Sequence, residues 1–168
     1  MPPAPLVDPA SIDDSRVLFD RDGIRRANPQ RFEMEQLTAI IQVDLENKLV
    51  IGYKDVTPDE FWVRGHMPDY PLFPGVLMCE AAAQLASFLT TQLGVFETGS
   101  FIGYGGIEDV RFRGQVKVGD RLILVGKGIR LHRRQTIFEC QGFVAGNMVF
   151  HGKIIGVPLV VSARDQAG

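Results

Sequence analysis

The stretch RGHMPDYPLFPGVLMCEAAAQLASFLTTQLG, residues 64–94, decides the fold. Its second half predicts one long helix over residues 75–93. This part follows Pro74, is rich in Ala, Leu and Gln, and precedes Gly94, and these residue types are typical of the start, the body and the end of a helix. The first turns are apolar on nearly all sides, so we expect the helix to be buried.

The segment before the helix carries prolines at positions 68, 71 and 74. This spacing matches the three residues per turn of polyproline II, so we predict a stiff extended arm from His66 to Pro74. Such an arm spans roughly 25 Å, which would keep His66 far from Glu80 of its own chain. Two chains packed about a two-fold axis would let the histidine of one reach the glutamate of the other.

Alternating apolar and polar residues predict strands that are joined by short turns. They cover residues 36–45, 49–56, 61–63, 101–118, 121–134, 135–145 and 148–157. Glycines inside the long strands indicate bulges or bends, as in a sheet that curls. The predicted fold class is α+β, with a curved antiparallel sheet wrapped around one long central helix.

The domain organisation is simple. Residues 1–28 are rich in Pro, Asp and Arg and are predicted to form a partly ordered N-terminal extension with a short helix within residues 16–27. Residues 29–168 are predicted to form a single domain, because no repeat or linker divides them.

The composition is that of an ordinary globular protein, with 45% hydrophobic and 23% charged residues among 168 and a net charge of −2. No apolar run is long enough to cross a bilayer, and no secretory signal pattern is present. Cys79 and Cys140 fit neither a disulfide framework nor a zinc site. We therefore predict a cytoplasmic protein without a metal, a cofactor or a membrane contact.

Positive charge is concentrated between residues 110 and 134, where eight Arg and Lys residues accompany one acidic residue, Asp120. This pattern is typical either of the solvated faces of strands or of a docking surface for an acidic partner. Nucleic-acid binding is disfavoured, because no binding motif or aromatic stacking pattern accompanies the charges.

His66 and Glu80 are the candidate acid–base pair, and a carboxyl group among small apolar residues suits general acid catalysis. The alternative for Glu80 is a place in a solvated stripe with Gln84, Ser87 and Thr91, which share one helix face. The backbone N–H of Gly75 belongs to the first helical turn, where donors are unpaired, and could polarise a carbonyl oxygen.

The run GHMPDYPLFPGVLMCEAAAQ resembles the signature of the hot-dog-fold β-hydroxyacyl-acyl-carrier-protein dehydratases of the FabZ and FabA types, in which GHFP is followed by PGVL and EA-x-AQ. The spacings from the histidine to the glycine and to the acid both agree, and glutamate at position 80 is more similar to FabZ. KDVTPDEFW and GIEDVRFRGQVKVGD extend the similarity over residues 29–157. The resemblance implies a hot-dog fold and a homodimer, with three dimers joined in some members.

The resemblance also implies an activity: removal of water from a β-hydroxyacyl thioester on acyl carrier protein, which gives a trans-2-enoyl thioester in fatty acid biosynthesis. His66 would take the α-proton, Glu80 of the partner chain would protonate the departing hydroxyl, and the N–H of Gly75 would hold the thioester oxygen. The basic stretch would dock the acidic carrier. The apolar tunnel for the acyl chain would be lined by Phe73, Val76, Phe101 and Ile102.

The chain departs from the family pattern beside the tunnel. PHR-Y is replaced by Pro29-Gln30-Arg31-Phe32 and VDR by Leu37-Thr38-Ala39, while Met67 and Val118 replace the usual Phe and Pro. These changes leave open a specialised dehydratase of polyketide or unusual lipid synthesis. A hot-dog thioesterase and a non-catalytic acyl-binding module are further alternatives. The former typically lacks the histidine arm, and the latter needs neither His66 nor Glu80.

Overall fold

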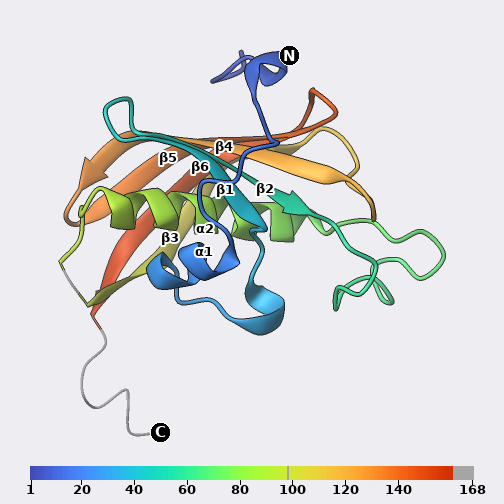
Figure 1. Cartoon of the computed structure of the whole chain (residues 1–168), viewed down its shortest axis with the longest axis horizontal. Coiled ribbons are helices and arrows are strands. Elements are labelled where there is room, and N and C mark those ends of the chain that lie inside the picture. The colour runs from blue at the N-terminus through green and yellow to red at the C-terminus, as the bar shows by residue number, and fades with distance from the viewer. Residues whose placement is uncertain (98, 161–168) are drawn as a thin grey trace, which may run out of the picture.

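One six-stranded antiparallel sheet forms the frame of the protein, as Figure 1 shows for the computed structural model. The structure describes residues 1–97 and 99–160. The strand order is β1-β2-β4-β5-β6-β3, so that β1 and β3 are the edges. The strands are β1 (Ala39–Asp44), β2 (Leu49–Asp55), β3 (Ser100–Phe112), β4 (Arg121–His132), β5 (Gln135–Val144) and β6 (Asn147–Val160).

The long helix α2 (Gly75–Gln92) lies along one face of this curved sheet (Figure 1) and contacts β2, β3, β4, β5 and β6. Its side chains Leu85, Phe88 and Leu89 are completely buried. A Cβ atom at Gly52 of β2 would lie 3.1 Å from Leu85 Cδ1, so glycine there allows helix and strand to approach closely. The predicted α+β hot-dog fold, with a curved antiparallel sheet around one long helix, is confirmed.

Most of the predicted elements are confirmed to within a few residues, and two strand predictions need correction. Residues 61–65 form turns rather than a strand. The N–H groups of Gly65 and His66 both bond the carbonyl of Trp62, at 3.1 and 2.8 Å. The strand predicted over residues 101–118 ends at Phe112, because the backbone N–H of Arg113 turns to the Val149 carbonyl at 2.7 Å.

The prediction of an extended arm from His66 to Pro74 is wrong, because the chain doubles back there. The N–H of Tyr70 bonds the Met67 carbonyl at 3.0 Å, which makes a turn with Pro68 in its second position. The N–H of Leu72 then bonds the His66 carbonyl at 2.9 Å and closes a compact loop. Pro68 therefore shapes a turn, in which a fixed φ is equally favourable.

The N-terminal residues pack on both sides of the sheet. A 3-10 helix, η1 (Pro9–Ser11), lies in a segment whose Leu6, Val7 and Ile12 cover the outer face of the sheet, opposite α2. The helix α1 (Arg21–Ala27) and the 3-10 helix η2 (Phe32–Met34) follow, and α1 packs against α2. The short helix predicted within residues 16–27 is thus confirmed as α1. Within the two described ranges, no helix has the length and apolar character to cross a membrane.

Candidate active site

A pocket of about 160 Å³ lies between α2 and the concave face of the sheet. Glu80 lines it near the start of the helix and is partly exposed. The other lining residues come from α2, from strands β3, β5 and β6, and from the loop before η2: Ala83, Ala86, Ser87, Thr90, Ile102, Gly103, Tyr104, Thr136, Ile154, Ile155, Gly156 and Gln30. The pocket therefore places a carboxyl group at one point of a narrow space beside the buried helix.

The carboxylate of Glu80 is held by the amide of Gln84, one helical turn further on. Gln84 Nε2 donates to Glu80 Oε1 at 2.8 Å and to the Met34 carbonyl at 2.6 Å, and Gln84 Oε1 accepts from the Gln36 N–H at 2.9 Å. Asn28 Nδ2 bonds the Gln84 carbonyl at 2.8 Å. Because Gln84 is buried and its amide is bonded on both sides, its orientation is fixed, and it fixes the carboxylate in turn.

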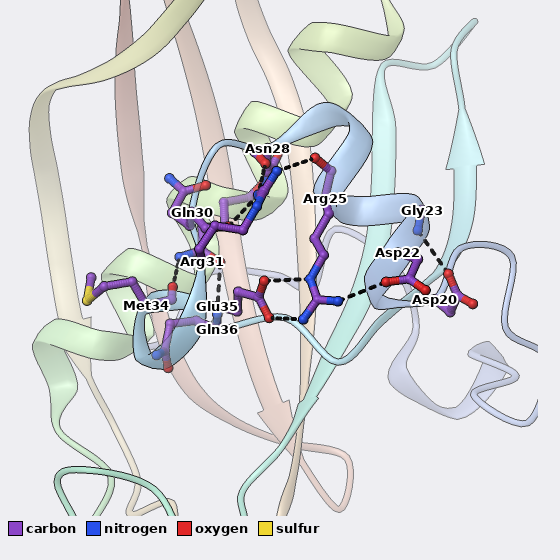
Figure 2. Close-up of polar contacts among 11 residues, drawn as sticks. Asp20, Asp22, Gly23, Arg25, Asn28, Gln30, Arg31, Met34, Glu35 and Gln36 are labelled. Carbon is purple, nitrogen blue, oxygen red and sulfur yellow. Dashed lines mark hydrogen bonds and ion pairs between the residues drawn. The ribbon is translucent and has the colours of Figure 1, made fainter. Parts of the chain in front are cut away.

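An ion pair secures the segment that holds Gln84 (Figure 2). The guanidinium of Arg25 donates to both oxygens of Glu35, at 2.7 and 2.9 Å, and to Asp22 at 2.8 Å. Arg25 also lowers the pKa of Glu35, mainly through these hydrogen bonds. Arg31 bonds the carbonyls of Asn28 and Arg25, at 2.8 and 3.1 Å. Residues before the first strand thus form the outer support of the Glu80 carboxylate.

His66 is half-buried in the loop that precedes α2, and its ring has a fixed orientation. Its Nδ1 lies 2.7 Å from the Leu72 carbonyl oxygen. A carbonyl oxygen can only accept, so this hydrogen bond requires the proton on Nδ1. In the neutral ring, Nε2 is then the basic nitrogen. His66 is absent from the residues that line the pocket beside Glu80.

A buried ion pair lies beneath the His66 loop. Lys54 Nζ is 2.9 Å from Glu60 Oε2, and both side chains are largely buried. The same carboxylate accepts from Trp62 Nε1 at 2.9 Å and from the Thr57 N–H at 3.0 Å. Burial lowers the pKa of Lys54, while the bond to Glu60 opposes that shift. Since the Trp62 carbonyl anchors the His66 N–H, the ion pair supports the backbone of the loop.

The residues predicted to line the tunnel are dispersed. Ile102 lines the pocket. Phe73 lies in the core, with its ring edge-on to Trp62 at 5.5 Å. Val76 and Phe101 are exposed in the single chain. Gly75, the predicted oxyanion donor, is the first residue of α2.

Several pocket residues were missed by reasoning from the sequence. Tyr104 lies within a glycine-rich run, yet its hydroxyl donates to the Cys79 carbonyl at 3.2 Å, and burial raises the pKa of the phenol. Thr90 lines the pocket, while Thr91 of the predicted polar stripe is exposed. Thr136 comes from a strand 46 residues further along the chain than Thr90, and only the register of the sheet brings it here.

The basic stretch does not form one surface, because β4 separates its ends. Arg121 opens the strand, and Arg133 and Arg134 follow its last residue, roughly 36 Å away at the usual rise per residue. Arg121 is engaged with Asp55, at 2.6 Å. Lys117 lies over the ring of Tyr70, at 4.7 Å, and is therefore next to the His66 loop.

Comparison with known proteins identifies the family of the chain. The family model described as FabA-like domain matches residues 28–153. The 3-hydroxyacyl-[acyl-carrier-protein] dehydratase FabZ of Acinetobacter baylyi is 33% identical over 139 residues, which are 82% of this chain and 93% of that protein. The FabZ of Streptococcus sanguinis is 32% identical over 82% of this chain and 96% of its own length.

Solved structures agree on the fold. The dehydratase heterocomplex ApeI:P from Xenorhabdus doucetiae superimposes with a TM-score of 0.67 at 15% identity, over 85% of this chain and 93% of that one. Cj0977, a sigma28-regulated virulence protein from Campylobacter jejuni, superimposes with a TM-score of 0.63 at 19% identity, over 91% of this chain and 99% of that one. With the FabZ sequences aligned over most of its length, the chain belongs to the FabA-like family of hot-dog proteins, as a FabZ-like member.

Proposed function

We propose that the protein is a 3-hydroxyacyl-[acyl-carrier-protein] dehydratase, which removes water from a β-hydroxyacyl thioester and leaves a trans-2-enoyl thioester, in fatty acid biosynthesis. Family membership supports the class of reaction. The observation that carries the assignment of roles is the hydrogen bond from His66 Nδ1 to the Leu72 carbonyl at 2.7 Å, because it leaves Nε2 as the base.

The reaction then needs three groups. Nε2 of His66 takes the α-proton, and the electron pair of that C–H bond moves into the thioester as enolate character develops on its oxygen. The N–H of Gly75, in the first turn of α2, stabilises this negative charge. As this electron pair forms the double bond between the α- and β-carbons, the C–O bond at the β-carbon breaks. The protonated carboxyl of Glu80 gives its proton to the departing hydroxyl, which leaves as water.

The two catalytic side chains belong to different chains in this proposal. His66 does not line the pocket that contains Glu80, and among the described residues β3 is an edge strand that pairs with β6 on one side only. That edge carries exposed apolar side chains at Phe101, Tyr104 and Ile107, which a soluble monomer would rarely leave uncovered. A homodimer that covers β3 would bring the partner's loop to the pocket beside it. Three such dimers could assemble further into a hexamer.

The substrate would arrive on acyl carrier protein. Of the basic residues, Lys117 lies beside the His66 loop, and the exposed Arg111 and Arg113 lie near it in the sequence, so these three are the proposed contacts for an acidic carrier. A cytoplasmic location would fit this partner.

Mixing two inactive variants tests the proposal. His66→Ala and Glu80→Gln are each expected to lose hydration of enoyl thioesters, followed as loss of the conjugated absorbance. After unfolding and refolding together, a random mixture of chains should recover about a quarter of the wild-type activity, because half of the dimers hold one intact site of two. No recovery would contradict the shared site. Release of free thiol by the wild type would indicate a thioesterase, and no turnover of any thioester would indicate a binding module.

A further inference from the structure

The part of the pocket beyond Glu80 is lined by polar side chains. Ser87 and Thr90 come from α2 and Thr136 from β5, and all three are more than nine-tenths buried, at 6%, 1% and 2% exposure. Gln30, from the loop before η2, joins them. A cavity for a plain hydrocarbon chain gains nothing from such groups, whereas a few placed polar groups in an otherwise apolar pocket are typical of a site that recognises a polar atom.

These groups have hydrogen-bonding capacity to spare. The Oε1 atom of Gln30 is buried and has no hydrogen-bond partner among the described residues. Within the same residues, no hydrogen bond involves the hydroxyl of Ser87 or Thr136. The hydroxyl of Thr90 donates to the Ala86 carbonyl at 2.8 Å and can still accept. A buried polar atom without a partner is costly, and a ligand that supplies the partner removes this cost.

The sheet leaves room for the hydroxyl of Thr136. Gly156 of β6 faces Thr136 across the β5–β6 pair, and a Cβ atom at Gly156 would lie 2.6 Å from the Thr136 hydroxyl oxygen. Any larger residue at position 156 would therefore displace this hydroxyl from the wall of the pocket.

The polar groups lie away from the proposed reacting end of the substrate. Ser87 and Thr90 follow Glu80 by seven and ten residues on the same helix, so they lie about 10 and 15 Å further along its axis. A thioester whose β-carbon is beside Glu80 would reach them only with the distal part of its acyl chain.

We infer that this pocket selects acyl chains that carry a hydroxyl group on their distal part, over plain alkyl chains of the same length. The inference rests on the proposed function, because it takes the pocket beside Glu80 as the acyl site. A hydroxyl group can both donate to and accept from the hydroxyls of Ser87 and Thr136, which line the pocket. Sites that hydrogen-bond a substrate hydroxyl reject the analogue without it more strongly than hydrocarbon pockets reject a hydroxyl.

Binding of unreactive substrates tests the inference without any chemistry. Saturated acyl phosphopantetheine thioesters of ten, twelve and fourteen carbons, with and without an ω-hydroxyl, are titrated into the full-length protein by calorimetry. We expect at least one ω-hydroxyacyl chain to bind about tenfold tighter than its alkyl counterpart. Equal or tighter binding of every plain chain, or no binding of any hydroxylated one, overturns the inference.

Variants locate the preference. Thr136→Val and Ser87→Ala should each remove most of the preference for the hydroxylated chain, measured as the ratio of the two affinities. Thr91→Val, at an exposed site on the same helix, is the matched control and should leave both affinities unchanged. A preference that survives both pocket variants contradicts the assignment of these hydroxyls. Hydration of plain 2-enoyl thioesters is measured separately: its loss would refute the dehydratase, while the binding ratio still decides the inference.

Discussion

Lys54 Nζ lies 2.9 Å from Glu60 Oε2, beneath the turn whose Trp62 carbonyl holds the His66 backbone. Replacing Glu60 by Gln leaves the buried ammonium without its counter-charge, so we expect a loss of about 3–5 kcal/mol in the free energy of unfolding. Urea unfolding measures this loss, and kcat should fall as the His66 turn loosens. Adding Lys54→Met should restore part of the stability. Glu46→Gln, in an exposed turn, is the control, and an equal effect there would refute the role of the pair.

The hydrogen bond between Gln84 and Glu80 predicts a loss of activity that is larger than the loss of stability alone would cause. Gln84→Met keeps the shape of the side chain but leaves the Gln36 N–H and the Met34 carbonyl unpaired, at a cost of about 1–3 kcal/mol in unfolding free energy. It also frees the Glu80 carboxylate, so kcat should fall about tenfold or more at a temperature where the variant remains folded.

A matched change on the same helix separates these effects. Gln92→Met alters an exposed glutamine at the end of α2 and should change neither kcat nor stability. If Gln84→Met loses stability but keeps the wild-type kcat and pH profile, Gln84 supports only the fold.

Ile107 lies near the middle of the β3 edge and is 48% exposed. Because the proposed dimer covers this edge, Ile107→Asp should place a charge in the interface and produce monomers, detected by light scattering during gel filtration. Activity should fall by about 100-fold or more, since His66 and Glu80 would no longer meet. Ile129→Asp changes an isoleucine on β4 that is 54% exposed and should leave the dimer intact. An active monomer of the Ile107 variant would exclude the shared site.

His151 should make the protein less stable in mild acid. Burial lowers the pKa of this histidine from 6.5. The charges of Arg113 and Arg111 lower it further, while those of Glu139 and Asp109 oppose the shift. Below pH 6.5 the unfolded chain takes up the proton first, so the free energy of unfolding falls as the pH drops, and no such loss arises above it. The Tm difference between pH 7.5 and 5.5 should therefore be smaller in His151→Gln than in the wild type. His132→Gln, in an exposed strand end, should show the wild-type difference.

Local signals predicted much of the fold. The helix over residues 75–93 and the strands β2, β4 and β5 are each marked by their own periodicity and by the residues at their ends, so their bounds could be predicted closely. The predicted end of β3 lay six residues too far along the chain. The conformation of the loop at residues 66–74 could not be predicted from its sequence. Proline fixes φ near the same value in polyproline II and in the second position of a turn, and only the hydrogen bonds from Tyr70 and Leu72 distinguish the two.

The residues of the candidate site also fall into two groups, those that a local motif predicts and those that it does not. His66, Gly75 and Glu80 lie within fifteen consecutive positions of a single motif, so their roles could be proposed from spacing. Gln30 and Thr136 are far from that motif in the sequence, and they reach the pocket through the loop before η2 and the register of β5 with β6. Long-range packing of this kind leaves no local pattern in one sequence.

The first twelve residues cover an apolar surface of the sheet, so we expect their removal to change the behaviour of the protein in solution. The family match begins at residue 28, yet Leu6, Val7 and Ile12 shield apolar side chains of β2, β4 and β5, and Gln141 of β5 bonds the backbone of Ala4 and Leu6. A shortened protein that starts at residue 28 would expose these apolar side chains of β2, β4 and β5 to water. It should self-associate and bind hydrophobic dyes, even though every proposed catalytic residue is retained.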